Sequence, residues 1–232
     1  MSAVTFRTAT INVKSNPEMR QTSVVHDVRK ASHQASIIGW QEIEPERYRQ
    51  AIRDLPPNWS HFMPKGSANP ISWRNDLWKK TGGDSITTHK GLAGVTPHRN
   101  ITWVKLKHRE TGKEVVRINT HLISGAWGEH KPTTEWRRKQ WREHMSQLND
   151  LVRHFEKQGA EVIVGGDFNR DSFKVLGDHV RYDNKLNVGT HGHSTLDYLM
   201  HTKGPELVNL GTRVQGGYAT DHDAVIGRYR LR

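Results

Sequence analysis

Residues 161–171, EVIVGGDFNRD, combine an apolar run with two glycines and then place Asp167 and Asn169 at its end. Valine and isoleucine favour strands, and a short apolar run bounded by glycines is typical of a buried strand. A carboxylate beside a buried strand costs several kcal/mol unless it is paired or holds a cation. The stretch therefore predicts a rigid strand that presents a carboxylate and an amide for use.

Other apolar stretches predict further strands on both sides of this one. They are residues 4–13, SIIGW (36–40), PISWR (70–74), NITWVKLKH (100–108), EVVRINTHL (114–122), AEVIVGG (160–166), TLDYLMHT (195–202) and DAVIGRYRL (223–231). Strands and helices are mixed without strict alternation, which favours an α/β or α+β sandwich over a doubly wound sheet.

Three stretches predict helices. Residues 16–35 begin with Asn16 as an N-cap and Pro17 at the first helical position, and residues 45–54 follow a strand. Residues 133–157 form the longest predicted helix. Its core-facing stripe consists of Trp141, Met145, Leu148, Val152 and Phe155.

The composition favours one soluble domain, residues 1–232, with a polyanionic partner. Lys and Arg number 35 against 24 Asp and Glu, which gives a formal charge of +11. A basic protein that is merely soluble is the alternative. There is no cysteine, so a metal site has to use Asp, Glu, Asn or His. The N-terminus lacks a leader pattern, and no apolar run reaches transmembrane length, so we expect an intracellular monomer without membrane contact.

Polar side chains recur at the ends of the predicted strands. They are Asn12, Glu42, His121, Asp167 with Asn169, Asp197, and Asp221 with His222. Each alone is explained by a turn, a surface acid or a satisfied interior histidine. Taken together beside apolar runs, they predict strand ends that converge on a hard cation, for which Mg²⁺ is the best match and Mn²⁺ a possible substitute.

The same residues carry a resemblance to a known family. TINV, WQE, NTHL, GGDFN, LDYLM and TDHDAV occur in the order found in the exonuclease-endonuclease-phosphatase superfamily, which includes deoxyribonuclease I and the AP endonucleases. The resemblance spans the chain from Asn12 to the last strand. It implies a four-layer sandwich of two packed mixed β-sheets flanked by helices, and a metal-dependent phosphoester hydrolase.

The resemblance also implies the roles of individual residues. Glu42 is then the principal metal ligand and Asp221 a second acidic ligand. His222 contacts the scissile phosphate as the catalytic histidine, and Asp197 orients it. Phosphodiester hydrolysis needs a positioned water and positive charge against an anionic transition state, which an Asp-supported imidazolium supplies.

Four further roles follow from the same resemblance. Asp167 helps to activate the attacking water and Asn169 steadies the phosphorus oxygens, while Asn12 positions Asp167 or the metal ligands. His121 resembles the second histidine of deoxyribonuclease I-like members, although the glutamate that supports it there has no counterpart in GSANPISWR. The glycines of GGDFN are interpreted as letting the backbone and a phosphate approach closely.

Substrate contacts are expected from Arg99, Arg170 and Lys14, which lie next to motif segments. Lys14 stands where AP endonucleases have an acid, which argues against that specialised activity. The favoured function is a DNA nuclease. The alternatives are a phosphatase or phosphodiesterase on inositol phosphates, lipids or nucleotides, and a non-catalytic nucleic-acid-binding relative. The Trp before GD and the CDR motif of inositol 5-phosphatases are absent.

Overall fold

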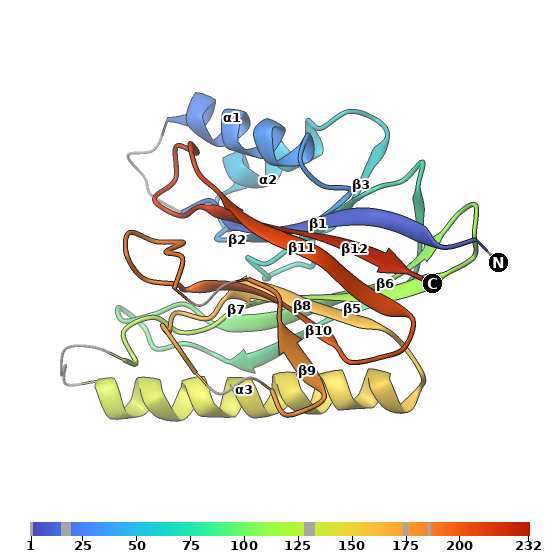
Figure 1. Ribbon diagram of the computed structural model, residues 1–232. Coiled ribbons are helices and arrows are strands. Elements are labelled where there is room, and N and C mark those ends of the chain that lie inside the picture. Colours follow the sequence, from blue (N-terminus) through green and yellow to red (C-terminus); the bar gives the residue numbers. More distant parts are fainter. Residues whose placement is uncertain (1, 15–19, 128–132, 174–175, 185–186) are drawn as a thin grey trace.

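Two six-stranded β-sheets lie face to face at the centre of the molecule, with helices on both outer faces (Figure 1). The computed structural model describes residues 2–14, 20–127, 133–173, 176–184 and 187–232. The four layers agree with the expected sandwich of two mixed sheets flanked by helices.

One sheet, called sheet A, contains both ends of the chain. Its spatial order is β11 (Leu207–Gln215), β12 (Ala224–Leu231), β1 (Val4–Asn12), β2 (Ile37–Gln41), β4 (Ile71–Arg74) and β3 (Trp59–Phe62). The other, sheet B, has the order β5 (Trp78–His89), β6 (Arg99–His108), β7 (Glu114–His121), β8 (Val162–Asp167), β10 (Asp197–Thr202) and β9 (Val180–Tyr182). The pairs β1–β2 and β7–β8 are parallel, and the remaining pairs are antiparallel.

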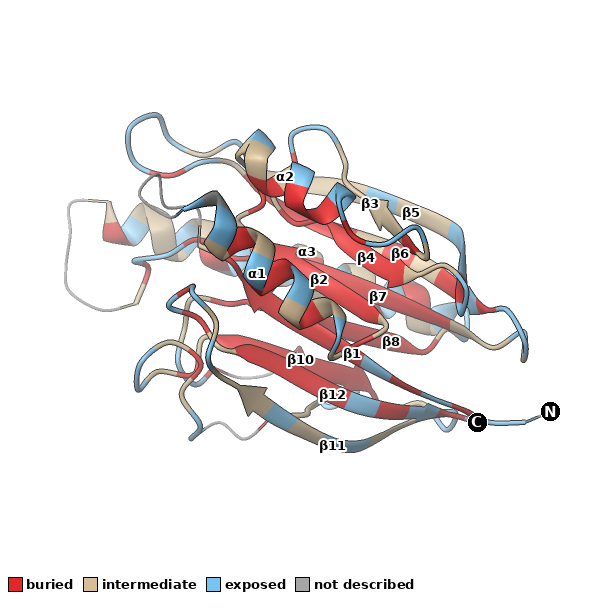
Figure 2. Ribbon diagram, turned by 90° about the horizontal axis from the view of Figure 1, so that it is seen from above, coloured by how far each residue is buried: buried red, intermediate tan, exposed pale blue. Residues whose placement is uncertain are grey.

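The helices divide between the two outer faces. α1 (Gln21–Ser32) and α2 (Glu46–Arg53) cover sheet A, and α3 (Thr134–Lys157) covers sheet B (Figures 1 and 2). The bounds predicted for α3 are confirmed to within one residue. α1 begins after Arg20, whose backbone is extended, and the expected cap at Asn16 and Pro17 lies outside the described residues.

Apolar side chains form three layers. Between α3 and sheet B they include the predicted stripe of α3, and between α1, α2 and sheet A they include Trp40 and Tyr48. The third layer lies between the sheets and contains Phe6, Ile163 and Leu199. Figure 2 shows the central strands buried beneath α1 and α2. Because the inner strands are covered on both faces over most of their length, most of their positions are core positions.

The layer between the sheets is polar toward one end of the strands. Gln41 Nε2 donates to Asn119 Oδ1 across the sheets over 2.6 Å, and Asn119 Nδ2 donates to the carbonyl oxygen of Trp40 over 2.7 Å. The fully buried Arg117 of β7 donates from Nε to Thr8 Oγ1 of β1 over 3.2 Å. These bonds satisfy buried polar groups and fix how one sheet sits on the other.

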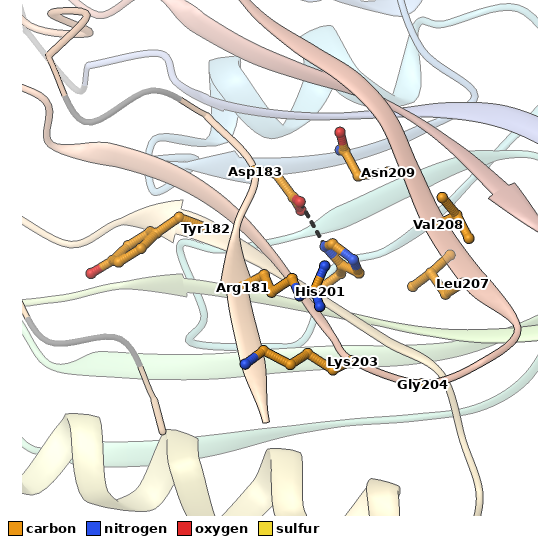
Figure 3. Close-up of a pocket in the computed structure, with 9 residues that line it drawn as sticks. All are labelled: Arg181, Tyr182, Asp183, His201, Lys203, Gly204, Leu207, Val208 and Asn209. Atoms are coloured by element: carbon orange, nitrogen blue, oxygen red, sulfur yellow. Dashed lines mark hydrogen bonds and ion pairs between the residues drawn. The ribbon is translucent and has the colours of Figure 1, made fainter. Parts of the chain in front are cut away.

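A second polar link joins the sheets at the far end of β10. Asp183 accepts from Tyr229 of sheet A over 2.6 Å, and its other oxygen lies 2.6 Å from His201 Nδ1 of sheet B. Figure 3 shows the two side chains of the Asp183–His201 contact beside a cavity of about 350 Å³. Burial raises the pKa of Asp183, while its hydrogen bond with His201 opposes the rise.

The glycines of GGDFN lie where other parts of the fold approach them closely. A Cβ at Gly165 would lie 2.6 Å from the Arg117 guanidinium, and one at Gly166 would lie 2.0 Å from the Thr120 carbonyl oxygen. Both glycines are buried. They make room for an intersheet side chain and for the backbone of a neighbouring strand, which confirms the close approach of the backbone, while the approach of a phosphate stays a prediction.

The predicted strands missed four of the observed ones. β3, β5, β9 and β11 were not foreseen, and these are the outermost strands of the two sheets. The other eight strands lie where the sequence predicted them, to within about two residues. No helix in the described part of the chain is both long enough and apolar enough to span a membrane.

Replacement of Gly166 by alanine should strongly destabilise the fold. The new methyl group would meet the Thr120 carbonyl oxygen, and the backbone φ of 156° is unusual for a residue with a side chain. We expect urea denaturation to show a loss of more than about 3 kcal/mol.

Gly94→Ala is the matched control, because Gly94 also has a positive φ but a Cβ there meets nothing within 4 Å. Its expected cost is about 1 kcal/mol. Equal losses in the two variants would contradict the steric explanation.

Candidate functional site

Strand ends from both sheets meet at one edge of the sandwich. β7 and β8 run parallel, so His121 pairs in register with Asp167, and the antiparallel β10 places Asp197 opposite Asp167. In sheet A, Asn12 pairs with Gln41, directly before Glu42. The polar end of the intersheet layer is therefore continuous with this edge.

Asn12 connects the two sheets at this edge. Its Nδ2 donates to Glu42 Oε1 over 3.1 Å and to Asp167 Oδ2 over 3.0 Å. Its Oδ1 accepts from the backbone N–H of Lys14 over 2.9 Å, which fixes the orientation of the amide. Asn12 is buried, so the side chain holds two carboxylates in place.

Asp197 and His222 form a buried carboxylate–imidazole pair. His222 Nδ1 donates to Asp197 Oδ2 over 2.8 Å, and Asp197 is fully buried. Burial alone would lower the pKa of His222, but the charge and hydrogen bond of Asp197, together with Asp167 and Asp221, raise this pKa to about 9. His222 is therefore an imidazolium at neutral pH.

The loop that carries His222 is fixed by hydrogen bonds to Asp27, a residue that was not predicted from the sequence. Asp27 of α1 is fully buried and accepts from the backbone N–H groups of Ala219 and Thr220. Thr220 Oγ1 in turn donates to the carbonyl oxygen of Asn12 over 2.9 Å. The loop is thus tied to α1 and β1 immediately before Asp221.

Asp167 is a buried carboxyl with an unusually high affinity for a proton. Burial and the negative charge of Asp197 raise its pKa to about 7, against the opposing effect of His222. Its Oδ1 accepts from the backbone N–H of Asn169 over 2.8 Å, and Asn169 Nδ2 donates to the carbonyl oxygen of Leu122. Asp167 can therefore exchange a proton close to neutral pH.

His121 lies beside Asp167 but differs from His222 in charge. Its Nε2 is 3.5 Å from Asp167 Oδ2, and the residue is buried. Burial, and then the positive charges of Arg99 and His222, hold the pKa of His121 well below its ordinary value. A neutral imidazole here favours hydrogen bonding over proton donation to a leaving group.

Three residues at the edge have an uncommon backbone conformation. Lys14, Glu42 and Asn169 have φ angles of 43°, 62° and 49°. Positive φ is unfavourable for residues with a side chain, and such positions concentrate at functional sites. The turns at the ends of β1, β2 and β8 therefore orient these side chains, and their backbone conformation costs free energy.

The acids of the edge match the ligand preference of a hard cation. Carboxylates of Asp167 and Asp197 with His222 offer ligand atoms within 4.8 Å of one another, and so do His191, Asp221 and His222. Asp197 Oδ1 is buried without a hydrogen-bond partner in the described part of the chain. A cluster of carboxylates and an unsatisfied buried oxygen fit a divalent ion.

The two expected metal ligands already attract a cation. Lys14 Nζ pairs with Asp221 Oδ2, and this hydrogen bond, followed by the charges of Asp221 and Glu42, raises the pKa of Lys14. Among the described residues, the clusters whose ligand atoms lie within 4.8 Å of one another do not include Glu42, whose carboxylate is bound by Asn12. Metal ligation by Glu42 and Asp221 stays a prediction.

Arg99 carries a buried charge next to the acids. It is 9% exposed, and its Nε has no hydrogen-bond partner among the described residues. Burial lowers the pKa of Arg99, while Glu42 and Asp167 oppose this effect. A guanidinium held in this way is positioned to meet an anion.

Arg170, the third residue expected to contact the substrate, lies beside two tryptophan rings. The Arg170 guanidinium is 3.8 Å from the ring centroid of Trp127 and 5.1 Å from that of Trp141. Its cation is therefore placed over aromatic faces rather than against the acids of the edge. The same ring of Trp127 lies 5.5 Å from the Arg138 guanidinium.

His191 is a site residue that the sequence reasoning missed. It lies in the loop before β10, its ring is 4.6 Å from that of His222, and its Nε2 is 3.3 Å from Asp221 Oδ2. A backbone bridge between His191 and His222 fixes the contact. The histidine pair of HGHS, directly before the LDYLM motif, is the signal that could have identified it.

The fold resembles solved structures that differ widely in sequence. An endonuclease/exonuclease/phosphatase from Bacteroides vulgatus has 16% identity and a TM-score of 0.77, with 99% of this chain and 100% of that chain covered. TDP2 from D. rerio, complexed with a single strand DNA product, has 16% identity, a TM-score of 0.72, and coverage of 97% and 98%.

A third similar structure is the mannosyl-6-phosphatase Bt3783 from Bacteroides thetaiotaomicron. It has 15% identity, a TM-score of 0.72, and coverage of 96% of this chain and 98% of that chain. No curated protein matches the sequence. At these identities the structural likeness concerns the fold alone.

The sequence itself matches a family model over most of its length. Residues 9–222 match the model described as the Endonuclease/Exonuclease/phosphatase family, and this range includes every residue expected at the site. The two packed six-stranded sheets agree with the same fold. The chain therefore belongs to the endonuclease/exonuclease/phosphatase family, whose members are phosphoester hydrolases that generally use divalent metal ions.

Proposed function

We propose that the protein is a Mg²⁺-dependent nuclease that hydrolyses phosphodiester bonds, with DNA as the favoured substrate. One observation carries the proposal: Asp167 and the buried Asp197–His222 pair place their polar atoms within 4.8 Å of one another at the edge, where the pKa of Asp167 is raised to about 7 and that of His222 to about 9. Asp167 and His222 thus hold opposite charges between these pH values. Hydrolysis of a phosphodiester needs both a proton acceptor for water and a positive charge for the phosphate.

Asp167 is the proposed acceptor of the water proton. Asn12 Nδ2 and the backbone N–H of Asn169 each bind one of its oxygens, so the carboxylate is fixed before substrate arrives. A carboxylate with a pKa near the working pH is effective because it is both ionised and basic enough to accept a proton. Asn169 contributes an amide beside the same position.

His222 and Arg99 are the proposed phosphate contacts. Asp197 holds His222 Nδ1, which leaves Nε2 of the imidazolium for a phosphate oxygen. Arg99 adds a second cation whose Nε has no hydrogen-bond partner in the described ranges. Fixed donors that already point at developing negative charge stabilise a transition state without reorganising.

Glu42 and Asp221 would hold the divalent ion, at the place where Lys14 now supplies a positive charge. When bound, the ion supplies charge neutralisation at the phosphate oxygens. Binding of the ion would displace the Lys14 ammonium from Asp221 toward solvent or substrate. Mn²⁺ would serve the same oxygen ligands.

Charge favours a polymeric substrate over a small one. The net charge of +11 and the arginines gathered around Trp127 offer a binding surface for a phosphate backbone. Similarity to a TDP2 that holds a DNA product supports this choice. Similarity to a mannosyl-6-phosphatase supports the alternative, a phosphatase or phosphodiesterase on small phosphoesters.

Purified protein should nick supercoiled plasmid DNA in the presence of Mg²⁺, and EDTA should abolish the nicking. Asp167→Asn should lower the rate by about 100- to 10,000-fold, because the water loses its proton acceptor. The exposed Asp150→Asn on α3 is the charge-matched control and should act like the native protein. Release of inorganic phosphate from small phosphoesters without any nicking would reject the nuclease in favour of the phosphatase.

Arg99→Met should lower activity while it raises the stability of the fold. We expect kcat/KM to fall by about 10- to 100-fold, since a charged hydrogen bond to phosphate is lost. The free energy of unfolding should rise by about 1 kcal/mol because the desolvation cost of a buried guanidinium is removed. Arg228→Met, at an exposed position of β12, should change neither quantity. A loss of stability in Arg99→Met with unchanged kcat/KM would assign Arg99 to the fold instead.

The pH profile of kcat/KM should be bell-shaped. Activity should rise as Asp167 loses its proton near pH 7 and fall as His222 loses its proton near pH 9. Asp197→Asn should move both limbs to lower pH, because Asp197 raises the pKa of both groups. NMR titration of the metal-free protein should show the same shift for the His222 imidazole. An alkaline limb that stays in place in Asp197→Asn would contradict the assignment to His222.

A further inference from the structure

His191 gives the edge a nitrogen ligand that the oxygen-rich magnesium site does not need. His191 Nε2 and Asp221 Oδ2 are 3.3 Å apart, and ligand atoms of His191, Asp221 and His222 all lie within 4.8 Å of one another. Two ligands at about 2.0–2.1 Å from a tetrahedral Zn²⁺ are roughly 3.3 Å apart. One edge of a zinc tetrahedron is therefore already present.

From this geometry we propose a second, inhibitory metal site formed by His191, Asp221 and His222, which takes Zn²⁺ or a similar transition-metal ion. Two imidazoles and one carboxylate are a ligand set for zinc, cobalt or nickel, whereas Mg²⁺ prefers oxygen ligands. The set leaves one tetrahedral position for water or a phosphate oxygen. Small side-chain movements bring the third ligand to bonding distance.

The surroundings of His222 prepare it as a ligand. Asp197 binds its Nδ1 over 2.8 Å and leaves Nε2 for the metal ion. A carboxylate bound to the far nitrogen of a histidine is the usual support of a zinc ligand, because it fixes the ring and increases the basicity of the nitrogen. Asp197 thus supports His222 for a phosphate or for a metal ion in the same way.

Backbone contacts hold the ligands together before an ion arrives. His191 and His222 form an antiparallel bridge, and the Asp223 N–H donates to the carbonyl oxygen of Thr190 over 2.7 Å. The Asp197 backbone N–H donates to Thr190 Oγ1, which ties this loop to the start of β10. The loop before β10 is therefore fixed against the loop before β12, and the entropy cost of assembling the site is small.

The consequence rests on the proposed function. Asp221 is the expected second magnesium ligand and His222 the expected phosphate contact, so an ion bound to both removes them from hydrolysis. Zinc would also have to displace Lys14 from Asp221. The site would then make the activity sensitive to transition metals at concentrations far below that of Mg²⁺.

Direct metal binding tests the site without relying on activity. The full chain is freed of metal with EDTA, dialysed, and titrated with Co²⁺ and Zn²⁺ in slightly alkaline buffer, because a metal ion has to replace the proton on a ligand nitrogen. Visible absorption reports tetrahedral cobalt, and calorimetry reports zinc affinity. His191→Ala should weaken the strongest binding at least about 10-fold and remove the cobalt band.

Two further variants complete the experiment. His193→Ala removes an exposed histidine two residues away in the same loop and should bind like the native protein. His191→Asn keeps a hydrogen-bond donor near Asp221 but is a poor zinc ligand, so it should behave like His191→Ala even if alanine disturbs the loop. Equal affinities and spectra in the native protein and both His191 variants would overturn the proposal and leave His191 as a hydrogen-bond partner of Asp221.

Inhibition gives the second readout. Zinc should inhibit Mg²⁺-dependent hydrolysis by the native protein and by His193→Ala, and His191→Asn should resist it. A protein that binds cobalt through His191 but hydrolyses no phosphoester would reject the proposed function and keep the metal site. Zinc inhibition of equal strength in native protein and His191→Asn would reject the site and keep the hydrolase.

Discussion

The hydrogen bond from Asn12 Nδ2 to Asp167 Oδ2 joins the two sheets at the edge where the expected catalytic groups meet. Asn12 ends β1 of sheet A, and Asp167 ends β8 of sheet B, so neither sheet contains the site alone. Behind this bond, the Gln41–Asn119 and Arg117–Thr8 contacts continue the same connection into the intersheet layer. Because these bonds are directional, they set the relative position of the sheets more closely than apolar contacts would. The distances between the expected catalytic groups therefore depend on this line of hydrogen bonds.

The composition of the intersheet layer changes along the strands for the same reason. Far from the edge the facing side chains are apolar, with Phe6 and Ile163 as examples, and they supply the burial that holds the sheets together. Closer to the edge they are replaced by threonines, amides and Arg117, which is fully buried. Burial lowers the pKa of Arg117 to about 10, so it keeps its charge at neutral pH. Gly39 and Gly165 leave the space for this side chain. Near the site, hydrogen-bonded polar side chains therefore replace apolar packing and fix the relative position of the two sheets.

This arrangement explains what the sequence could and could not reveal. The eight strands it predicted are the inner ones, which are mostly buried on both faces and carry strong apolar patterns. The four edge strands pair on one side only and carry weaker patterns, as in the WKKTGGDSITTH of β5. In β7 the apolar side chains alternate with Arg117 and Asn119, a pattern typical of a strand with one wet face. Only the second sheet, which comes from distant sequence, shows that this face is buried. The motif residues were found because each lies next to a strand, but His191 lies in a loop whose path no local pattern predicts.

The acids of the edge differ in how firmly they are held. The buried acids suit the chemical step, whereas the exposed acid suits the binding of different cations. Asp167 and Asp197 are buried on neighbouring strands and cannot move far. Asp221 lies in a loop, 37% exposed, and contacts both Lys14 and His191. A rigid pair of groups sets where water and phosphate must lie, whereas an accessible carboxylate can exchange one positive partner for another at low cost. We therefore propose Asp221 as the position at which the Lys14 ammonium, Mg²⁺ and a transition-metal ion would compete. In this proposal, the cation bound to Asp221 would decide whether the imidazolium of His222 remains available for a phosphate.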